Sequence, residues 1–252
     1  MLAAERRGLL LTRLHQDGKL VARDLAIELG ISEHSLRRDL RELAAAGLCQ
    51  RVYGGALPVS PARGEFETRL RVATESKRRI AARAAQLITP GTTVILGGGT
   101  TVHAVAQALP ENLKVLVVTP SPATAAELVK HPTVDLFMLG GRILKQPASV
   151  CGAAAADAAS KISADLYLLG VAGVHVDEGF TTNDPDEAAM ERFLVGRAAD
   201  TYVLASSDKL GTVAAFSVVE LSGVAGVITD ADDSHPTVRG LRQRKVPVFH
   251  AA

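Results

Sequence analysis

The amino-acid sequence predicts an α/β protein in two unequal parts, a small helical module followed by a larger domain built on a mostly parallel sheet. The chain has 252 residues, which suits one large or two unequal domains. Apolar residues recur at helical spacing in the first part, and from about residue 60 short apolar runs alternate with helical stretches. Hydrophobic residues make up 47% of the chain and charged residues 22%, a balance that excludes intrinsic disorder.

Composition also limits the cellular setting. Because no run of about 18 apolar residues occurs, we expect no membrane span. Charged side chains interrupt the first 20 residues, which argues against a signal peptide and for a cytoplasmic protein. Cys49 and Cys151 are far apart in the chain and suit reduced thiols. We expect no metal and no cofactor.

Charge is distributed unevenly along the chain. Residues 1–80 hold 15 Lys or Arg against 10 Asp or Glu, whereas residues 81–252 hold 13 against 17. A basic N-terminal part on a slightly acidic body suggests a module that binds a polyanion. Ordinary fluctuation in composition is the alternative.

Three short helices are expected in the first part. The first carries Leu9, Leu10 and Leu14 on one face and ends at the turn signal Asp17-Gly18. The apolar spacing then predicts a second and a third helix before the pattern changes.

Glycines and a serine mark the ends of these later helices. The second helix lies between Val21 and Leu29 and is stopped by Gly30. Ser32 is the expected N-cap of the third helix, which ends at Gly47. The two helices are therefore joined by a tight turn.

The third helix presents a polar and basic face. Its exposed candidates are Ser32, His34, Ser35, Arg37, Arg38 and Arg41. A helix fits the major groove of B-DNA, where such groups reach base edges and phosphates. Since neighbouring helical residues point about 100° apart, Arg37 can face a base edge while Arg38 contacts phosphate, or the reverse. The alternative is an ordinary solvated helix face.

Residues 48–57 form a short extended stretch with Gly54-Gly55 inside it. Three helices followed by a two-stranded ribbon outline a winged helix-turn-helix, predicted over residues 1–57. The two glycines allow close approach of backbone to a phosphate, and Arg51 and Tyr53 supply a cation and a hydroxyl. A plain tight turn is the alternative.

A linker is predicted over residues 58–76, where prolines, Ser60 and Gly64 cluster. Strands are expected beyond it at 92–96, 115–118, 134–139, 166–171, 202–205, 224–228 and 246–249, with helices at 77–88, 101–109, 122–129, 153–160, 186–198 and near residue 238. Continuous apolar strands separated by helices imply a Rossmann-like, mostly parallel sheet covered on both faces, over residues 77–252.

Several glycine- or serine-rich turns follow these strands, where open parallel sheets bind ligands. The turn at 97–101, Gly-Gly-Gly-Thr-Thr, offers peptide NH groups, a helix N-terminus and two hydroxyls as a phosphate cradle. Turns at 139–142, 170–182 and 206–209 offer further hydroxyls and Lys209. Ligand-free connections remain the alternative for each.

The N-terminal pattern resembles a known family. Residues 21–26 and 30–40, the latter Gly-Ile-Ser-Glu-His-Ser-Leu-Arg-Arg-Asp-Leu, resemble the helix-turn-helix of the DeoR family of bacterial transcription regulators. Gly47-Leu48, Arg51 and residues 53–56 are similar to that family's wing. The resemblance implies that Ser32, His34, Ser35, Arg37, Arg38, Arg41, Arg51, Tyr53, Gly54 and Gly55 bind DNA.

The later turns resemble the effector domain of the same family, which is similar in fold to ribose-5-phosphate isomerase and CoA transferases. The resemblance implies binding of a phosphorylated sugar or polyol. The candidate effector-binding residues are Gly98, Gly99, Thr100, Thr101, Thr119, Gly140, Gly141, Gly152, Gly173, Gly179, Thr181 and Lys209.

Three positions depart from the family pattern. Glycine replaces an acidic residue near Gly97, Pro120 replaces an asparagine, and Glu191 stands where a lysine is usual. Polar groups around the cradle therefore differ, so that either the ligand is unusual or effector sensing has weakened.

We expect a homo-oligomeric regulator that binds double-stranded operator DNA and represses a carbohydrate operon under control of a phosphorylated sugar or polyol. We expect no enzyme activity, since the loop carboxylates fall in no catalytic motif. Two alternatives stay open: an isomerase-like enzyme acting on sugar phosphates that carries a DNA-binding module, and an oligomeric DNA binder that has lost its effector.

Overall fold

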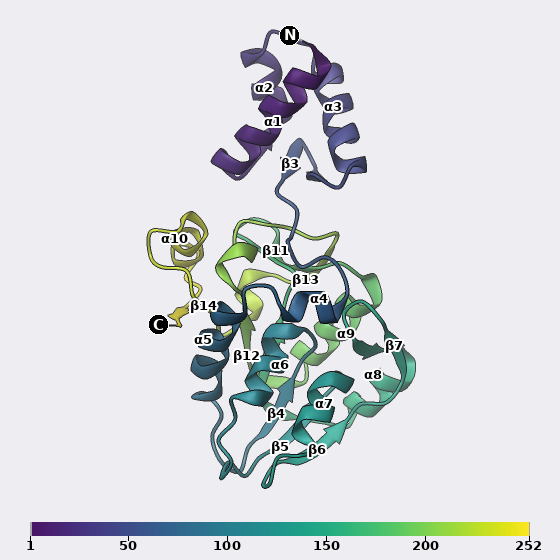
Figure 1. The fold of residues 1–252 in the computed structure, drawn as a ribbon, viewed down its shortest axis with the longest axis vertical. Coiled ribbons are helices and arrows are strands. Elements are labelled where there is room, and N and C mark those ends of the chain that lie inside the picture. The colour runs from purple at the N-terminus through teal and green to yellow at the C-terminus, as the bar shows by residue number, and fades with distance from the viewer. Residues whose placement is uncertain (1, 252) are drawn as a thin grey trace.

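The computed structural model describes residues 2–251 and contains both expected parts. Figure 1 shows the small helical module at one end of the long axis and the sheet domain at the other, joined by the chain that leaves β3. The expected α/β class is confirmed.

The N-terminal module has three helices and a small sheet. Its elements are α1 (Ala3–Asp17), β1 (Leu20–Val21), α2 (Ala22–Glu28), α3 (Glu33–Ala45), β2 (Gln50–Val52) and β3 (Gly55–Leu57). The sheet has three strands in the order β1-β3-β2, where the sequence predicts a two-stranded ribbon. The two-residue strand β1 escapes a search for alternating apolar residues because it is too short to show a period.

Leucines hold this module together. Leu10, Leu14, Leu36 and Leu40 are almost completely buried in one cluster that joins α1 to α3. Their spacing places each on the inner face of its helix, so that the polar positions between them point outward. The core thereby decides which face of α3 remains free.

Residues 58–76, for which a linker is predicted, are folded against the larger domain. They contain α4 (Phe66–Leu70) and the start of α5 (Thr74–Ala85). Val59 bridges to Val213, and the buried Ser60 hydroxyl donates to the carbonyl of Ala172 at 2.6 Å. Buried polar groups need such partners. These contacts make segment 58–76 part of the larger domain.

Seven parallel strands form the central sheet, in the order β15-β14-β12-β9-β4-β5-β6. The strands are β4 (Thr93–Leu96), β5 (Leu116–Thr119), β6 (Asp135–Met138), β9 (Ala164–Gly170), β12 (Ala198–Leu204), β14 (Gly226–Thr229) and β15 (Val248–His250). From β4 the chain moves outward to β5 and β6, and it then returns to β9 on the other side of β4. Strand order therefore reverses between β4 and β9.

Helices cover both faces of this sheet, as the sequence predicts. One apolar core takes residues from α5, α6 (Thr100–Gln107) and α7 (Pro122–Leu128), and the other from α8 (Ala153–Ser160), α9 (Pro185–Val195) and α10 (Pro236–Gln243). Helices thus pack on both faces of the sheet. The edge at the carboxyl ends of its strands is left for polar groups.

Antiparallel strands add to the domain where loops are predicted. Segment 170–182 contains β10 (Gly173–His175) and β11 (Gly179–Thr182), which pair with each other and, through β11, with β13 (Phe216–Val219). A hairpin of β7 (Arg142–Leu144) and β8 (Ser149–Cys151) follows β6. Short 3-10 turns occur at Ser207–Lys209 and Leu221–Gly223.

Two other features bear on the expectations from composition. Cys49 and Cys151 are both buried free thiols. Within residues 2–251, every helix is too short or too polar to cross a membrane.

Candidate functional site

The third helix carries its basic side chains on the outside of the module. The Arg37 and Arg38 side chains are 58% and 73% exposed. Each pairs one turn away, Arg37 with Glu33 at 2.6 Å and Arg38 with Glu42 at 3.3 Å. Surface pairs of this kind contribute little to stability, so both guanidinium groups are free to exchange a carboxylate for a phosphate.

The other predicted contacts on α3 divide into exposed and structural ones. His34 and Arg41 are exposed. Ser32 is the N-cap, since its hydroxyl accepts from the amide of Ser35 at 3.2 Å, and the two hydroxyls lie 2.9 Å apart. These serines begin the helix, and their hydroxyls are already engaged with each other.

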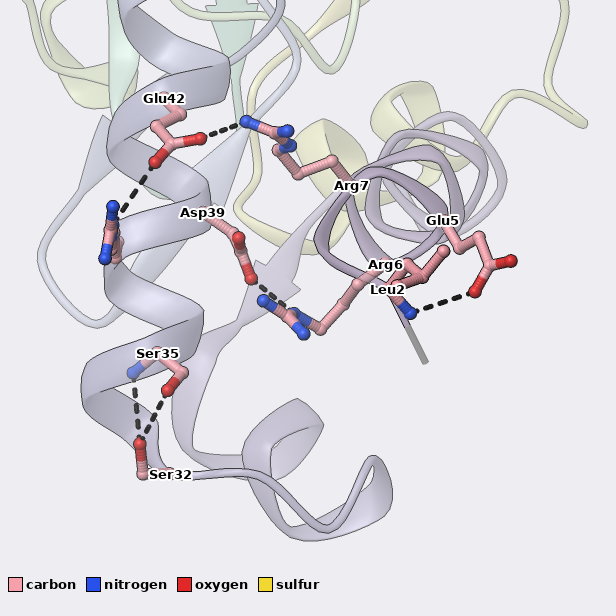
Figure 2. Close-up of polar contacts among 9 residues, drawn as sticks. Leu2, Glu5, Arg6, Arg7, Ser32, Ser35, Asp39 and Glu42 are labelled. Atoms are coloured by element: carbon pink, nitrogen blue, oxygen red, sulfur yellow. Dashed lines mark hydrogen bonds and ion pairs between the residues drawn. The ribbon is translucent and has the colours of Figure 1, made fainter.

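Two arginines on α1 hold α3 in place. Arg6 donates to the buried carboxylate of Asp39 at 2.5 Å, and Arg7 pairs with Glu42, as Figure 2 shows. Asp39 is therefore structural. Because it is buried, removing Arg6 would leave an uncompensated charge in the module.

The wing presents its tip to solvent. Tyr53 is fully exposed and Gly54, with φ +81°, makes the turn between β2 and β3. Gly55 has a different role from the one expected, because a Cβ there would lie 1.7 Å from the carbonyl oxygen of Leu20. Gly55 permits β3 to pack against β1, and it is buried, so it offers no phosphate contact.

A cavity of about 350 Å³ opens at the carboxyl ends of β4, β9 and β12. These three neighbouring strands include the point where strand order reverses, the usual position of ligands in open α/β sheets. Its walls are formed by Ala62, Arg63, Gly64, Arg69, Gly98, Gly99, Thr100, Thr101, Gln146, Pro147, Gly170, Val171, Ala172, Thr182, Asn183, Asp184, Glu187, Lys209 and Ala215.

Five of the predicted effector residues meet at this cavity. They are Gly98, Gly99, Thr100, Thr101 and Lys209. The remaining predicted residues lie outside its lining: Thr119, Gly140, Gly141, Gly152, Gly173, Gly179 and Thr181. The turn at 97–101 and the 3-10 turn at 207–209 are brought together because their parent strands are close neighbours in the sheet.

Three of the predicted residues outside the lining, Thr119, Thr181 and Gly173, have structural roles. The Thr119 hydroxyl accepts from the amide of Ser121 at 3.1 Å, and that of Thr181 accepts from the amide of Ala214 at 2.9 Å. A Cβ on Gly173 would lie 2.6 Å from the Thr212 carbonyl oxygen, which only glycine avoids. Local hydrogen bonding accounts for Thr119 and Thr181, and close packing accounts for Gly173.

Gly99 begins α6 at the cavity. Its φ of +93° favours glycine, and open space surrounds the position where a Cβ would stand. The free peptide NH groups of the first turn of α6 therefore face a side open to a ligand. Within residues 2–251 the buried hydroxyl of Thr101 has no hydrogen-bond partner, which leaves a donor for such a ligand.

Three cations converge behind this turn. Lys77 and Lys209 are 6% and 8% exposed, and with Arg69 they line a second, smaller chamber of about 50 Å³. Arg69, Thr100 and Lys209 are common to both chambers. The two chambers therefore meet at a wall of positive charge.

Backbone carbonyls are the hydrogen-bond partners of these cations. Lys209 donates to Val171 at 2.8 Å, Lys77 to the carbonyl of Arg69, and the Arg69 guanidinium to Gln146 at 2.8 Å. In the described part of the chain none of the three forms an ion pair with a carboxylate, and Arg69 Nε is buried without a partner. Positive charge is thus buried here without a direct ion pair, and the nearby carboxylates of Asp208 and Glu187 only partly oppose the lowering of the Lys209 pKa.

The same arrangement shifts the basicity of these groups. Burial, helped by the charges of Arg69 and Lys77, lowers the pKa of Lys209 to about 8. Burial also lowers the pKa of Lys77 and of Arg69. Desolvation opposes the charged form of each cation, and an anion beside them would reverse that effect.

Carboxyl and amide side chains form the far wall of the larger chamber. Asp184 caps α9 by accepting from the amides of Asp186 and Glu187. Burial raises the pKa of Glu187, and the Thr182 hydroxyl donates to its carboxyl group. Asn183 lies beside them. This wall holds hydrogen-bonding groups suited to hydroxyls, and Glu187 is close enough to Arg69 and Lys209 for their charges to oppose the rise of its pKa.

Glu191 lies outside the cavity lining. It is buried on α9, and burial raises its pKa well above the ordinary value for a carboxyl group, as it does for the Tyr167 phenol. The lysine usual at position 191 is therefore replaced by a carboxyl group that burial favours as the neutral form. Lys77, Lys209 and Arg69 supply the cations of the cavity instead.

Sequence reasoning missed Lys77, Arg69, Glu187 and Asn183. Lys77 and Arg69 fall in stretches without a recognisable motif, and only the folding of segment 58–76 brings them to the turn at 97–101. The pair Thr182-Asn183, which follows a predicted loop rich in hydroxyls, was the available signal for the acidic wall.

Comparison with protein families decides the identity of this architecture. Residues 6–62 match the DeoR-like helix-turn-helix domain, and residues 72–231 match the DeoR C terminal sensor domain. The chain belongs to the DeoR family of transcriptional regulators. The helix-turn-helix match covers α3, and the sensor match covers most of the cavity lining, whereas Arg63, Gly64 and Arg69 lie between the two matched ranges.

Curated relatives in the DeoR family extend along nearly the whole chain. The putative aga operon transcriptional repressor of Escherichia coli O157:H7 is 30% identical and matches 98% of this chain and 93% of its own length. The transcriptional regulator GlpR of Haloferax volcanii is 33% identical over 91% of both chains. The glycerol-3-phosphate regulon repressor of Escherichia coli K12 is 29% identical over 92% of both.

Solved structures similar to this chain include ribose 5-phosphate isomerase A from Methanocaldococcus jannaschii, with a TM-score of 0.41, 17% identity and coverage of 54% of each chain. The initiation factor eIF-2B of Pyrococcus horikoshii has a TM-score of 0.46, 17% identity and coverage of 63% of each chain.

Proposed function

We propose that this DeoR-family regulator represses a carbohydrate operon and that a phosphorylated sugar or polyol, bound in the cavity, changes its affinity for operator DNA. The gathering of Lys77, Lys209 and Arg69, which form no ion pair in the described part of the chain and whose pKa values burial lowers, carries the proposal. Burying charge without a counter-charge is costly, and an anion that binds there offsets the cost.

The positions of these groups suggest how such a ligand would lie. The phosphate group suits the small chamber, where four cations (Arg63, Arg69, Lys77 and Lys209), Thr100 and the N-terminus of α6 converge. The sugar or polyol then extends into the larger chamber toward Asn183 and Glu187, which accept and donate hydrogen bonds to hydroxyls.

DNA binding uses the other end of the molecule. Two copies in a homo-oligomer place their α3 helices in successive major grooves, about 34–36 Å apart. Arg37, Arg38, Arg41 and the exposed wing residues Arg51 and Tyr53 then contact the duplex. A ligand changes operator affinity only through different affinity for the two arrangements of these helices.

A thermal-shift screen of sugar and polyol phosphates tests the proposal, with the matching unphosphorylated compounds as controls. We expect a phosphorylated compound to raise the melting temperature, since ligand at 100 times its Kd stabilises by about 2.7 kcal/mol. The same compound should change operator binding in an anisotropy titration.

Other outcomes of the screen separate the remaining functions. Turnover of a compound, followed by NMR, would favour an isomerase-like enzyme. Equal shifts with phosphorylated and unphosphorylated compounds would contradict a phosphate site, and no shift with any compound would favour a regulator without an effector.

Affinity for the phosphorylated effector should fall as pH rises above about 8. The ammonium form of Lys209 holds the phosphate, and its pKa of about 8 means that the free protein loses this form above that pH. Linkage then predicts a decrease of up to about tenfold per pH unit until the pKa of the bound state is reached. Below that pH the ammonium is present and affinity should level off.

Isothermal calorimetry across this range measures the effect. The matched variant is Lys209→Arg, whose side chain stays charged and should flatten the profile, leaving only the smaller contribution of Lys77, whose pKa is also lowered. An equally steep fall in Lys209→Arg would show that another group causes it.

A further inference from the structure

Arg63 lies where the effector cavity meets the end of the DNA-contacting helix. Its Nη1 donates to the carbonyl oxygen of Gly47 at 3.5 Å, and its side chain also lines both chambers. Gly47, with φ +72°, closes the C-terminal turn of α3. Arg63 thus contacts the winged module through its guanidinium group and belongs to the lining of the cavity in the sensor domain.

The backbone that carries Arg63 is fixed to the cavity wall. Ser60 donates to the carbonyl of Ala172 at 2.6 Å, and Asn183 donates to that of Ala62 at 2.8 Å. Both Ala172 and Asn183 line the larger chamber. The base of Arg63 therefore belongs to the sensor domain, while its tip reaches the winged module.

The carbonyl oxygen of Gly47 is a weak partner for the Arg63 guanidinium. A carbonyl at a helix C-terminus carries only partial negative charge, and in the described residues the side chain of Arg63 makes no ion pair with a carboxylate. A phosphate oxygen is a charged acceptor, and hydrogen bonds between two charged groups are roughly twice as strong. An anion in the cavity therefore competes well for this guanidinium.

We propose that Arg63 couples the two sites as a positioning residue. An anion draws its side chain away from Gly47 and releases the C-terminal end of α3 from the sensor domain. The module then stays attached through Pro58 and Val59, which pair with Val213, and reorients about this short segment. This inference rests on the proposed function, because it requires an anion in the cavity.

The test follows the distance between the two modules in the full chain. Spin labels are placed at Ala45→Cys on α3 and Lys161→Cys beside α8, both exposed positions, while the native cysteines are buried. Double electron–electron resonance is recorded with and without saturating inorganic phosphate. We expect phosphate to shift or broaden the distance distribution of the otherwise wild-type chain.

The decisive variant is Arg63→Ala. We expect it to give the phosphate-bound distribution without phosphate and to show no further change on adding it. Arg71→Ala is the matched control, because Arg71 is an exposed arginine of the same segment that lies outside both chambers. It should respond as the wild type does. Arg63→Lys keeps the charge and should restore part of the response.

Calorimetry with inorganic phosphate separates this inference from the proposed function. Arg63→Ala should still bind phosphate, more weakly than the wild type by up to the roughly tenfold to 150-fold expected for one lost hydrogen bond to a charged group, since Lys77, Lys209 and Arg69 remain. If phosphate binds and Arg63→Ala still changes distance as the wild type does, Arg63 is not the coupling residue. The same holds if phosphate binds and the wild type shows no distance change. Failure of phosphate to bind the wild type would overturn both proposals.

Discussion

Replacing Arg37 and Arg38 together with alanine is expected to weaken operator binding by at least about 30-fold. Each arginine that contacts a base or phosphate contributes about 1–3 kcal/mol, and the two losses combine on one helix. The fold should survive, because both side chains are more than half exposed and their pairs with Glu33 and Glu42 are surface pairs. Anisotropy titration with labelled operator DNA measures the affinity.

Arg78→Ala serves as the matched control for this prediction. Arg78 is also an exposed arginine paired with a nearby glutamate, but it lies on α5 in the sensor domain. Operator affinity should be unchanged in this variant. Salt titration adds a second reading, since each lost phosphate contact reduces the slope of log affinity against log salt by about 1. Unchanged specific binding in the double variant would show that α3 is not the reading helix.

Replacing Lys209 with methionine is expected to lower affinity for the phosphorylated effector by roughly tenfold to 150-fold. A hydrogen bond to a charged group contributes about 1.5–3 kcal/mol, which corresponds to that range. Methionine fills similar space without the charge, so the buried position does not have to accommodate an ammonium group. Calorimetry with the compound found by thermal shift gives the affinity.

Lys209→Met should lose effector affinity without losing stability or DNA binding. Because burial already disfavours the charged form of Lys209, the unliganded Lys209→Met protein should melt at a temperature close to that of wild type and bind operator DNA normally. Lys161→Met, at an exposed position outside the cavity, should change neither effector affinity nor DNA binding. Full effector affinity in Lys209→Met would place the phosphate elsewhere.

The helix-turn-helix was the most predictable part of the molecule. Its leucine spacing, Gly30 and the N-cap Ser32 act through local geometry and through one small core, so the positions of three helices follow from neighbouring residues. The roles of Asp39 and Gly55 follow less directly. Gly55 is required by close packing on Leu20, a contact that a pattern of residues does not reveal.

The effector cavity was predictable only in part. The turn at 97–101 carries a local signature, because a strand, a glycine run and a helix N-terminus are contiguous in sequence. Thr119 and Gly173 are of the same residue types as the turn at 97–101, but they lie away from the cavity. Thr119 makes a local hydrogen bond, and Gly173 permits close packing. A glycine or threonine near a strand end is therefore not sufficient by itself to predict a ligand site.

By itself the sequence determined the two-part organisation, the exposed basic face of α3 and the turn that begins α6, because each depends on residues within a few turns of one another. Only the tertiary structure decided that Lys77, Arg69 and Lys209 meet in one place and that Arg63 reaches Gly47. Those side chains come from segments well separated in sequence, and their meeting depends on strand order and on how segment 58–76 packs. Electrostatic coupling depends on distance in space, which local patterns do not encode.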